Sequence, residues 1–421
     1  MSTSPDTRRL ESEVARRRTF AIISHPDAGK TTLTEKLLLY GGAIHLAGAV
    51  KARRASRHAT SDWMKMEQER GISVTSSVMQ FTYADHCVNI LDTPGHQDFS
   101  EDTFRTLAAA DSAVMLIDAA KGVEPQTEKL FRVCKLRGIP IFTFVNKMDR
   151  EGREPLDLMD ELESHLGMPA CPVNWPVFDD NRFAGVYDRR TERIHVFSSQ
   201  KDHGATAVDA VVVPYAEAKG HPDLPPGCLA KLEEDLELLD VAGDPYDEER
   251  VLNGELSPMF FGSALTNFGV EPFLEAYLEM GPAPTTRKTV DGEVSATDAA
   301  FSGFVFKIQA NMDTSHRDRI AFLRVCSGRF RKGMEARHVR LGKTLRLKNP
   351  SAFMARERSV IEEAYAGDIL GLYDPGVFRI GDTLTTGKDV RFEGIPHFSP
   401  ELFRRIRVGD PLKRKQLLKG L

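Results

Sequence analysis

The chain has 421 residues, of which 41% are hydrophobic, enough for two or three domains with ordinary buried cores. Its net charge of −5 argues against a protein that coats nucleic acid, and runs such as residues 113–117 are too short to span a bilayer. The five cysteines are scattered without a CxxC pair, so neither a disulfide framework nor a zinc site is expected. The N-terminus lacks the apolar segment of a secretion signal, and we expect it to form a short surface helix of a cytoplasmic protein.

The first predicted elements are a buried strand at residues 19–23 and a helix at residues 31–39, joined by a candidate phosphate-binding loop. Backbone N–H groups of this loop would face the phosphates, Lys30 would neutralise their oxygens, and the Thr31 hydroxyl would bind Mg²⁺. The strict motif opens with Gly where this chain has Ser24, so a chance strand-to-helix turn is the alternative. The candidate loop consists of Ser24, His25, Pro26, Asp27, Ala28, Gly29, Lys30, Thr31 and Thr32.

A second predicted strand, residues 86–91, ends in Asp92, Thr93, Pro94, Gly95 and His96. Asp92 is placed to reach Mg²⁺ through water, and Gly95 can bring its backbone N–H close to a γ-phosphate because it has no Cβ. His96 would orient the attacking water. Taken alone, it could also be an ordinary histidine of a surface loop.

A third strand, residues 138–145, precedes Asn146, Lys147, Met148 and Asp149. The Asp149 carboxylate matches the paired N–H donors of guanine, and Asn146 can bridge the base and the phosphate loop. This segment favours GTP over ATP, which argues against a P-loop ATPase or kinase. Farther on, residues 259–264 read as a strand with a small-residue loop. There the N–H of Ser263 or Ala264 would recognise the guanine keto oxygen.

The remaining chain divides by pattern. Residues 152–256 contain alternating strand-like runs and charged helical runs, which favour an inserted subdomain over one long loop. Residues 283–300 resemble a linker, and residues 301–395 contain short β-type runs typical of a small antiparallel barrel. Residues 402–408 read as a strand, after which Asp410 and Pro411 begin a helix.

With these segments in place, the chain resembles the translational GTPases and, within them, the bacterial release factor 3 family. The stretches that carry the resemblance are residues 20–32, 61–64, 68–75, 304–313 and 401–407. It implies an α/β P-loop GTPase domain at residues 1–282 with an inserted subdomain. An antiparallel β-barrel second domain at 301–395 and the incomplete start of a third α+β domain at 396–421 would follow. We therefore expect a chain truncated within its third domain.

The resemblance also implies a function. The chain would be a ribosome-stimulated GTPase of translation termination that drives class I release factors off the ribosome after peptide release. Its catalytic residues would be His96, Lys30 and Gly95, and its Mg²⁺ ligands Thr31, Asp92 and Ser73, with Thr75 a less favoured substitute for Ser73. Ser73 stands where elongation factors carry Thr, and its hydroxyl can serve the same ligand role.

The implied partners are the ribosome, with its rRNA and ribosomal proteins, and through it the class I release factors. No membrane partner is expected, and the protein would act as a monomer. The basic runs at residues 51–58 and 404–419 would either meet rRNA phosphates or form solvated surface. Two alternatives stay open: an elongation factor G-like translocase, and a nucleotide-binding module without ribosome-stimulated turnover.

Overall fold

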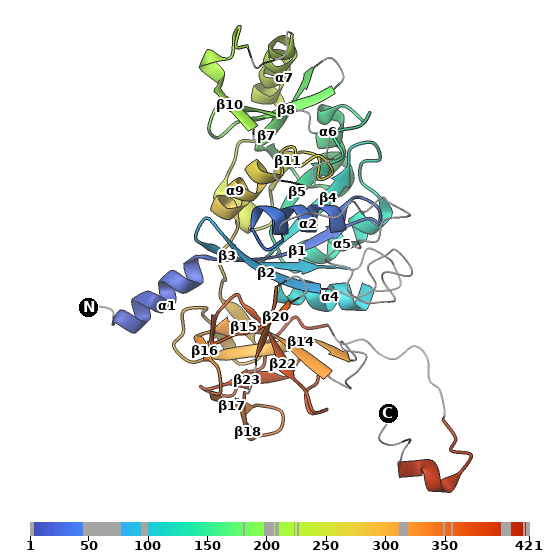
Figure 1. Cartoon of the computed structure of the whole chain (residues 1–421), viewed down its shortest axis with the longest axis vertical. Coiled ribbons are helices and arrows are strands. Elements are labelled where there is room, and N and C mark those ends of the chain that lie inside the picture. Colours follow the sequence, from blue (N-terminus) through green and yellow to red (C-terminus); the bar gives the residue numbers. More distant parts are fainter. Residues whose placement is uncertain are drawn as a thin grey trace.

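The computed structural model describes residues 4–44, 77–93, 100–179, 182–197, 206, 210–222, 224, 227–310, 319–347, 350–354, 357–396, 406–415 and 417. The predicted residues Ser73, Thr75, Pro94, Gly95 and His96 lie outside this part, as do the basic run at 51–58, residues 404–405, 416 and 418–419 of the second run, and residues 402–405 of the predicted strand. Along the long axis of the molecule, a small sheet, a large helix-covered sheet and a second large sheet follow one another (Figure 1).

The central sheet has seven strands in the order β2-β3-β1-β4-β5-β11-β6. They are β1 (Arg17–Ser24), β2 (Ser77–Tyr83), β3 (His86–Asp92), β4 (Ser112–Asp118), β5 (Ile141–Asn146), β6 (Ala170–Pro172) and β11 (Ser257–Phe261). All neighbours are parallel except β2, which runs antiparallel to β3. Strands β1, β4 and β5 are buried along their whole length, which explains their largely continuous apolar runs.

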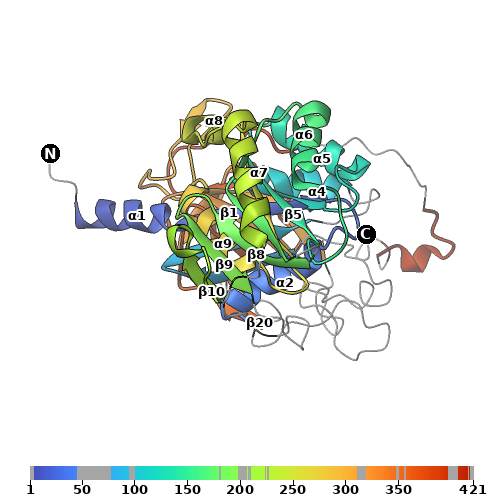
Figure 2. The same ribbon diagram turned by 90° about the horizontal axis from the view of Figure 1, so that it is seen from above.

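Alternate residues of β1 point to opposite faces of this sheet. Phe20 and Ile22 share a core with α2 (Lys30–Tyr40) and α9 (Val270–Met280). Ala21 and Ile23 belong to the other core. That core includes side chains of α4 (Ser100–Ala109), α5 (Pro125–Leu136) and α6 (Pro155–Leu166). Figure 2 shows α2 on one side and α4, α5 and α6 on the other. This doubly covered sheet confirms the predicted α/β domain.

A separate four-stranded antiparallel sheet, in the order β10-β9-β8-β7, occupies part of the predicted insertion. Its strands are β7 (Asn174–Asp179), β8 (Arg182–Asp188), β9 (Arg193–Phe197) and β10 (Ala210–Pro214), followed by η2 (Tyr215–Glu217), α7 (Cys228–Ala242) and α8 (Glu248–Leu252). The buried Trp175 donates from Nε1 to Asp235 of α7 at 2.9 Å. The Asn174 side chain exchanges bonds of 2.7 and 3.1 Å with the main chain of Phe261, which attaches this sheet to the central one.

The second large sheet is an antiparallel half-barrel in the order β18-β17-β23-β14-β15-β22-β19-β20, accompanied by the pair β16-β21. Its strands are β14 (Ser302–Ala310), β15 (Arg319–Ser327), β16 (Arg329–Arg331), β17 (Glu335–His338), β18 (Lys343–Arg346), β19 (Ser351–Met354), β20 (Glu357–Val360), β21 (Glu363–Tyr365), β22 (Ile369–Tyr373) and β23 (Thr383–Thr385). Side chains such as Val305, Leu323 and Leu370 form its own core. The sequence predicted this antiparallel domain correctly.

The segment predicted as a linker contains a short hairpin of β12 (Arg287–Thr289) and β13 (Gly292–Val294). The hairpin is fastened to the central domain, because Arg287 donates to the carbonyls of Ala108 and Ala110 at the end of α4 and pairs with Asp111 at 2.9 Å. Such bonds satisfy carbonyls that a helix end leaves without a partner.

The two ends of the described chain differ in packing. Helix α1 (Pro5–Ala15) begins at Ser4, whose hydroxyl accepts from the Thr7 N–H, and it buries Leu10 and Val14. Near the other end, residues 406–408, the described part of the predicted strand, form no strand, and Ile406 is 55% exposed. Asp410 does cap a turn, the 3₁₀ helix η3 (Pro411–Lys413). Among the described residues, no helix is both long and apolar enough to cross a membrane.

Candidate nucleotide site

The candidate phosphate loop lies between β1 and α2, at the edge where the parallel strands of the central sheet end. Two of its residues have left-handed backbone conformations, Asp27 with φ 65° and Gly29 with φ 103°. A Cβ on Gly29 would lie 2.3 Å from Nδ2 of Asn146, so only glycine fits there. The phosphate loop therefore packs closely against Asn146, the first residue of the segment predicted to bind the guanine base.

The start of α2 provides a positive environment. Gly29 caps the helix without a side-chain bond, and the first turn contains no acidic residue. The N–H groups of such a turn, together with the helix dipole, favour an anion. Thr31 and Thr32 are half-buried in this turn.

Lys30 and Asp92 face each other beside the loop. Their charged atoms are 3.3 Å apart, and the two side chains are only 7% and 2% exposed. The neighbouring Thr93 donates from its hydroxyl to Ile22 O at 2.6 Å, which ties the end of β3 to β1. The buried carboxylate of Asp92 and the hydroxyls of Thr31 and Thr32 in the first turn of α2 are the hard oxygen donors that Mg²⁺ prefers. The described residues thus fit the predicted metal, although Ser73 lies outside them. They include no group of three or more His, Cys, Asp or Glu side chains suited to a metal.

The side chain of Asn146 connects its own segment to the phosphate loop and to the small-residue loop after β11. Its Nδ2 donates to Ala28 O at 2.8 Å, and its Oδ1 accepts from the Ala264 N–H at 2.8 Å. The Asn146 side chain therefore contacts the phosphate loop, as one half of the predicted bridge requires, and it also contacts the small-residue loop after β11.

Lys147 has φ 69° and donates from Nζ to Asp27 O at 2.6 Å and to Asp118 Oδ2 at 2.5 Å. Burial acts to raise the pKa of Asp118, but the bonds from Lys147 and from the Ala120 N–H hold it below its usual value. The ion pair fixes the lysine stem between the phosphate loop and the end of β4.

Asp149 is positioned by the loop after β11. Its Oδ1 accepts from the Ser263 hydroxyl at 2.5 Å, and Met148 N donates to Gly262 O at 3.2 Å. The Ser263 N–H is bonded to Phe268 O at 2.8 Å. Of the two N–H groups predicted to read the keto oxygen, the Ser263 group is therefore used within its own loop, and the Ala264 group meets the Asn146 side chain.

Three residues of this region were not found from the sequence: Asp118, Glu124 and Thr127. Thr127 accepts from the His25 N–H at 2.9 Å, and Glu124 lies 3.5 Å from the His25 ring. None of the three belongs to a local sequence pattern, and Asp118 reaches the site because β4 pairs with β5, which places Asp118 beside Asn146.

Two family models match the chain. The "Elongation factor Tu GTP binding domain" matches residues 15–283, and "Elongation factor G domain 2" matches residues 300–387. A solved structure from Thermus thermophilus superposes with a TM-score of 0.73 at 26% identity, covering 96% of this chain and 60% of that one. The fold is thus shared with a longer chain.

Curated relatives are more similar in sequence. A "Peptide chain release factor 3" of Symbiobacterium thermophilum is 62% identical over 412 residues, which are 98% of this chain and 78% of that protein. One from Nostoc punctiforme is 58% identical over 421 residues, covering 77% of its length. The chain therefore belongs to the peptide chain release factor 3 family of translational GTPases.

Proposed function

We propose that the chain binds GTP and GDP at the end of its central sheet and hydrolyses GTP when a ribosome stimulates it. Residues 24–32 would hold the phosphates, with Lys30 balancing the charge of the γ-phosphate. Asp149 would pair with the two N–H groups of guanine. The buried position of Lys30 and the hydroxyl bond that orients Asp149 support these roles.

The observation that carries the proposal is the pair of hydrogen bonds made by the Asn146 side chain. One amide side chain links the phosphate loop at Ala28 to the base-side loop at Ala264. These bonds hold the phosphate loop and the base-side loop next to each other, so that phosphates bound along residues 24–32 and a base bound at Asp149 would belong to one molecule. The chain therefore has a preorganised frame for a nucleotide, and the carboxylate at its base end selects guanine.

Mg²⁺ would be held by Thr31, Asp92 and Ser73, and when bound it would offset negative charge on the β- and γ-phosphates. Around it, the chain's own groups would act on the substrate: Lys30 would hold the phosphate oxygens, the Gly95 N–H would donate to the γ-phosphate, and His96 would position the attacking water.

In the cell, we place this reaction in the cytoplasm at the end of protein synthesis. The GTP-bound chain, acting as a monomer, would bind a ribosome after peptide release and promote departure of the class I release factor, and hydrolysis would let the chain leave. The names of its relatives support the termination role. We retain the proposed bounds of 1–282, with an insertion at about 152–256, for the GTP-binding domain. Those of the linker (283–300), the second domain (301–395) and the start of a third domain (396–421) are also retained.

The test is GTP hydrolysis by this chain with and without post-termination ribosomes, in the wild type, His96→Ala and His86→Ala. His86 is a matched control, because its ring hydrogen-bonds to Ala84 O in the turn before β3, away from the candidate phosphate loop. We expect ribosomes to stimulate the wild type and His86→Ala, and His96→Ala to lose about 100-fold of the stimulated rate.

Binding of mant-GDP, a fluorescent analogue, separates the remaining alternatives. Nucleotide binding without ribosomal stimulation would show a nucleotide-binding module without turnover. Stimulation that survives in His96→Ala would remove His96 from the reaction.

A further inference from the structure

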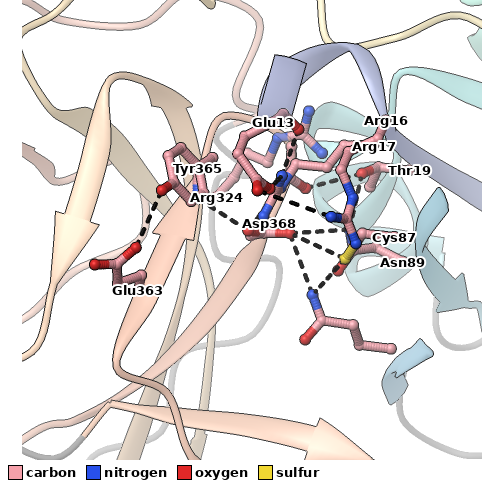
Figure 3. Close-up of polar contacts among 12 residues, drawn as sticks. Glu13, Arg16, Arg17, Thr19, Cys87, Asn89, Arg324, Glu363, Tyr365 and Asp368 are labelled. Atoms are coloured by element: carbon pink, nitrogen blue, oxygen red, sulfur yellow. Dashed lines mark hydrogen bonds and ion pairs between the residues drawn. The ribbon is translucent and has the colours of Figure 1, made fainter. Parts of the chain in front are cut away.

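One turn of the half-barrel lies against the central sheet at β1, β2 and β3. The turn comprises Tyr365, which ends β21, and residues 366–368, which lead into β22. Figure 3 shows its carboxylate, Asp368, among side chains from these strands. The contact joins the domain matched by one family model to the domain matched by the other.

Asp368 is the centre of this contact, with its side chain only 3% exposed. Its carboxylate accepts from Arg17 Nε at 2.8 Å, Gln80 Nε2 at 3.2 Å, Asn89 Nδ2 at 3.5 Å, Cys87 Sγ at 3.6 Å and, within its own turn, Tyr365 N at 2.9 Å. A single buried charge from the half-barrel therefore reaches β1, β2 and β3 at once.

The backbone of the same turn reinforces the contact. The Thr19 hydroxyl donates to Gly367 O at 2.8 Å, and the Arg17 guanidinium lies over the Tyr365 ring at 4.7 Å from its centroid. Gly367 has φ 106°, and a Cβ there would lie 2.7 Å from Pro284 and 3.1 Å from Arg17 Cβ. Glycine is needed for so close an approach.

The three strands lead to the candidate nucleotide site. Strand β1 runs from Arg17 to Ser24, the first residue of the phosphate loop, and β3 runs through Asn89 to Asp92. Strand β2 begins at residue 77, directly after the segment that contains Ser73 and Thr75. A displacement of this edge of the sheet would therefore move Ser24 and Asp92 together, because hydrogen-bonded strands move as one rigid element.

We infer that Asp368 is a positioning residue for GTP binding and hydrolysis, through which docking of the half-barrel holds the edge of the sheet formed by β1, β2 and β3 in place beside the candidate nucleotide site. The inference goes beyond the proposed function but rests on its nucleotide site. Coupling of this kind is reciprocal, so a bound nucleotide must strengthen docking by the factor by which docking strengthens nucleotide binding.

The first test measures release of mant-GDP from the full chain in the wild type, Asp368→Asn and a matched control, Arg324→Met. Arg324 is 1% exposed and also pairs across the two domains, at 2.5 Å from Asp111. Asp111 precedes β4 and keeps Arg287 as a partner. Both variants thus remove a buried ion pair between the domains, but only Asp368→Asn releases β1, β2 and β3.

We expect Asp368→Asn to release mant-GDP about fivefold faster or more, and Arg324→Met to stay within about twofold of the wild type. Equal acceleration in both variants, or none in a folded Asp368→Asn, would overturn the inference. If Asp368→Asn does not fold, Gln80→Leu decides in its place, because it removes only the side-chain bonds of β2 and leaves the Arg17 ion pair. A wild type that fails to hold mant-GDP would instead overturn the proposed nucleotide site.

The second test uses the Cys87 thiol as a probe of docking. Cys87 is half-buried at this contact, whereas the other four cysteines are buried. Burial and the nearby Asp368 carboxylate raise the pKa of the Cys87 thiol to about 12, so separation of the domains should speed its alkylation by iodoacetamide. We expect saturating GDP to slow this alkylation in the wild type and to have less effect in Gln80→Leu. An equal effect of GDP in the two proteins would contradict the coupling.

Discussion

At the scale of single residues, Asn146 and Asp149 receive their positions from loops far away in the sequence. Asn146 is held between Ala28 and Ala264, and Asp149 is held by Ser263. Each of these bonds spans more than a hundred positions of the chain. The base end of the candidate site therefore depends on the loop after β11 as much as on its own segment.

We expect Asp149→Asn to weaken GTP binding about 100-fold and to shift preference toward xanthosine triphosphate. The amide presents a donor where guanine also presents donors, and an unsatisfied buried polar group costs about 1–3 kcal/mol. Competition of GTP and xanthosine triphosphate against mant-GDP measures the change.

Ser263→Ala is the control for this substitution. It removes the 2.5 Å bond that orients Asp149 but leaves the carboxylate in place. It should weaken binding of GTP without changing the preferred base. GTP affinity that is unaltered in Asp149→Asn would refute the assigned guanine contact.

Sequence reasoning found the residues with chemistry in a recognisable spacing, and it missed those that support them. Asp118 anchors Lys147 only because β4 pairs with β5, which puts Asp118 beside Asn146. Thr127 meets the His25 N–H from the first turn of α5. Neither residue belongs to a local pattern, because the pairing of strands and helices brings them there.

At the scale of elements, helix α1 connects the two large domains, because it packs on the half-barrel and leads directly into β1 of the central sheet. Leu10 and Val14 are buried with Ala296, Tyr365 and Ala366 on the side of the half-barrel. The helix then leads into β1 through Arg17, which pairs with Glu13 at 2.7 Å and with Asp368 at 2.8 Å. A segment expected as a surface helix is thus part of the contact between domains.

We expect Leu10→Asp to release this helix, because it places a charge in an apolar contact at a cost of about 2–3 kcal/mol. Trypsin should then cleave after Arg8 or Arg16 several times faster, and the melting temperature should fall. Leu136→Asp, at a leucine that is 87% exposed at the end of α5, should change neither. Equal cleavage of both variants would show that α1 contributes nothing to the contact.

Apolar periodicity located most elements, and two differences have physical causes. The hairpin of β12 and β13 lies in a polar segment, and its order depends on Arg287 reaching α4 and Asp111. Residues 406–408 have a strand-like pattern, but strands need hydrogen-bonded neighbours, and Ile406 is exposed.

At the scale of the whole molecule, each large domain contains a carboxylate whose lowered pKa makes the free energy of unfolding depend on pH. Asp118 lies in the central domain and Asp382 in the half-barrel. Burial alone would raise the pKa of Asp382, but bonds from Arg340 and the Arg379 N–H, together with His338, hold it below its usual value. A carboxyl whose pKa is lower in the folded state stabilises it fully above its unfolded pKa, and this contribution is lost as the pH falls through the folded pKa.

We expect Asp382→Asn to lower the free energy of unfolding by about 2–4 kcal/mol at neutral pH, because it leaves Arg340 and the buried His338 without their carboxylate. As the pH falls from about 4, the usual pKa of an aspartate, toward the lowered pKa of folded Asp382, the difference from the wild type should shrink, since the carboxyl becomes protonated first in the unfolded and then in the folded wild type. Urea unfolding at a series of pH values measures it. A difference that does not depend on pH would mean that the charge of Asp382 contributes no stability.

The sequence by itself determined the order of elements, the α/β and antiparallel character of the two large domains, and the motifs of a guanine-nucleotide site, because apolar periodicity and motif spacing are local properties. Only the tertiary structure decided how those motifs are supported and how the domains meet. Asp368 and Arg17 lie 351 positions apart, and nothing in the local sequence around either residue indicates the other. Their contact exists because the packed half-barrel presents one turn to the edge of a folded sheet, and such proximity is a property of the assembled surfaces.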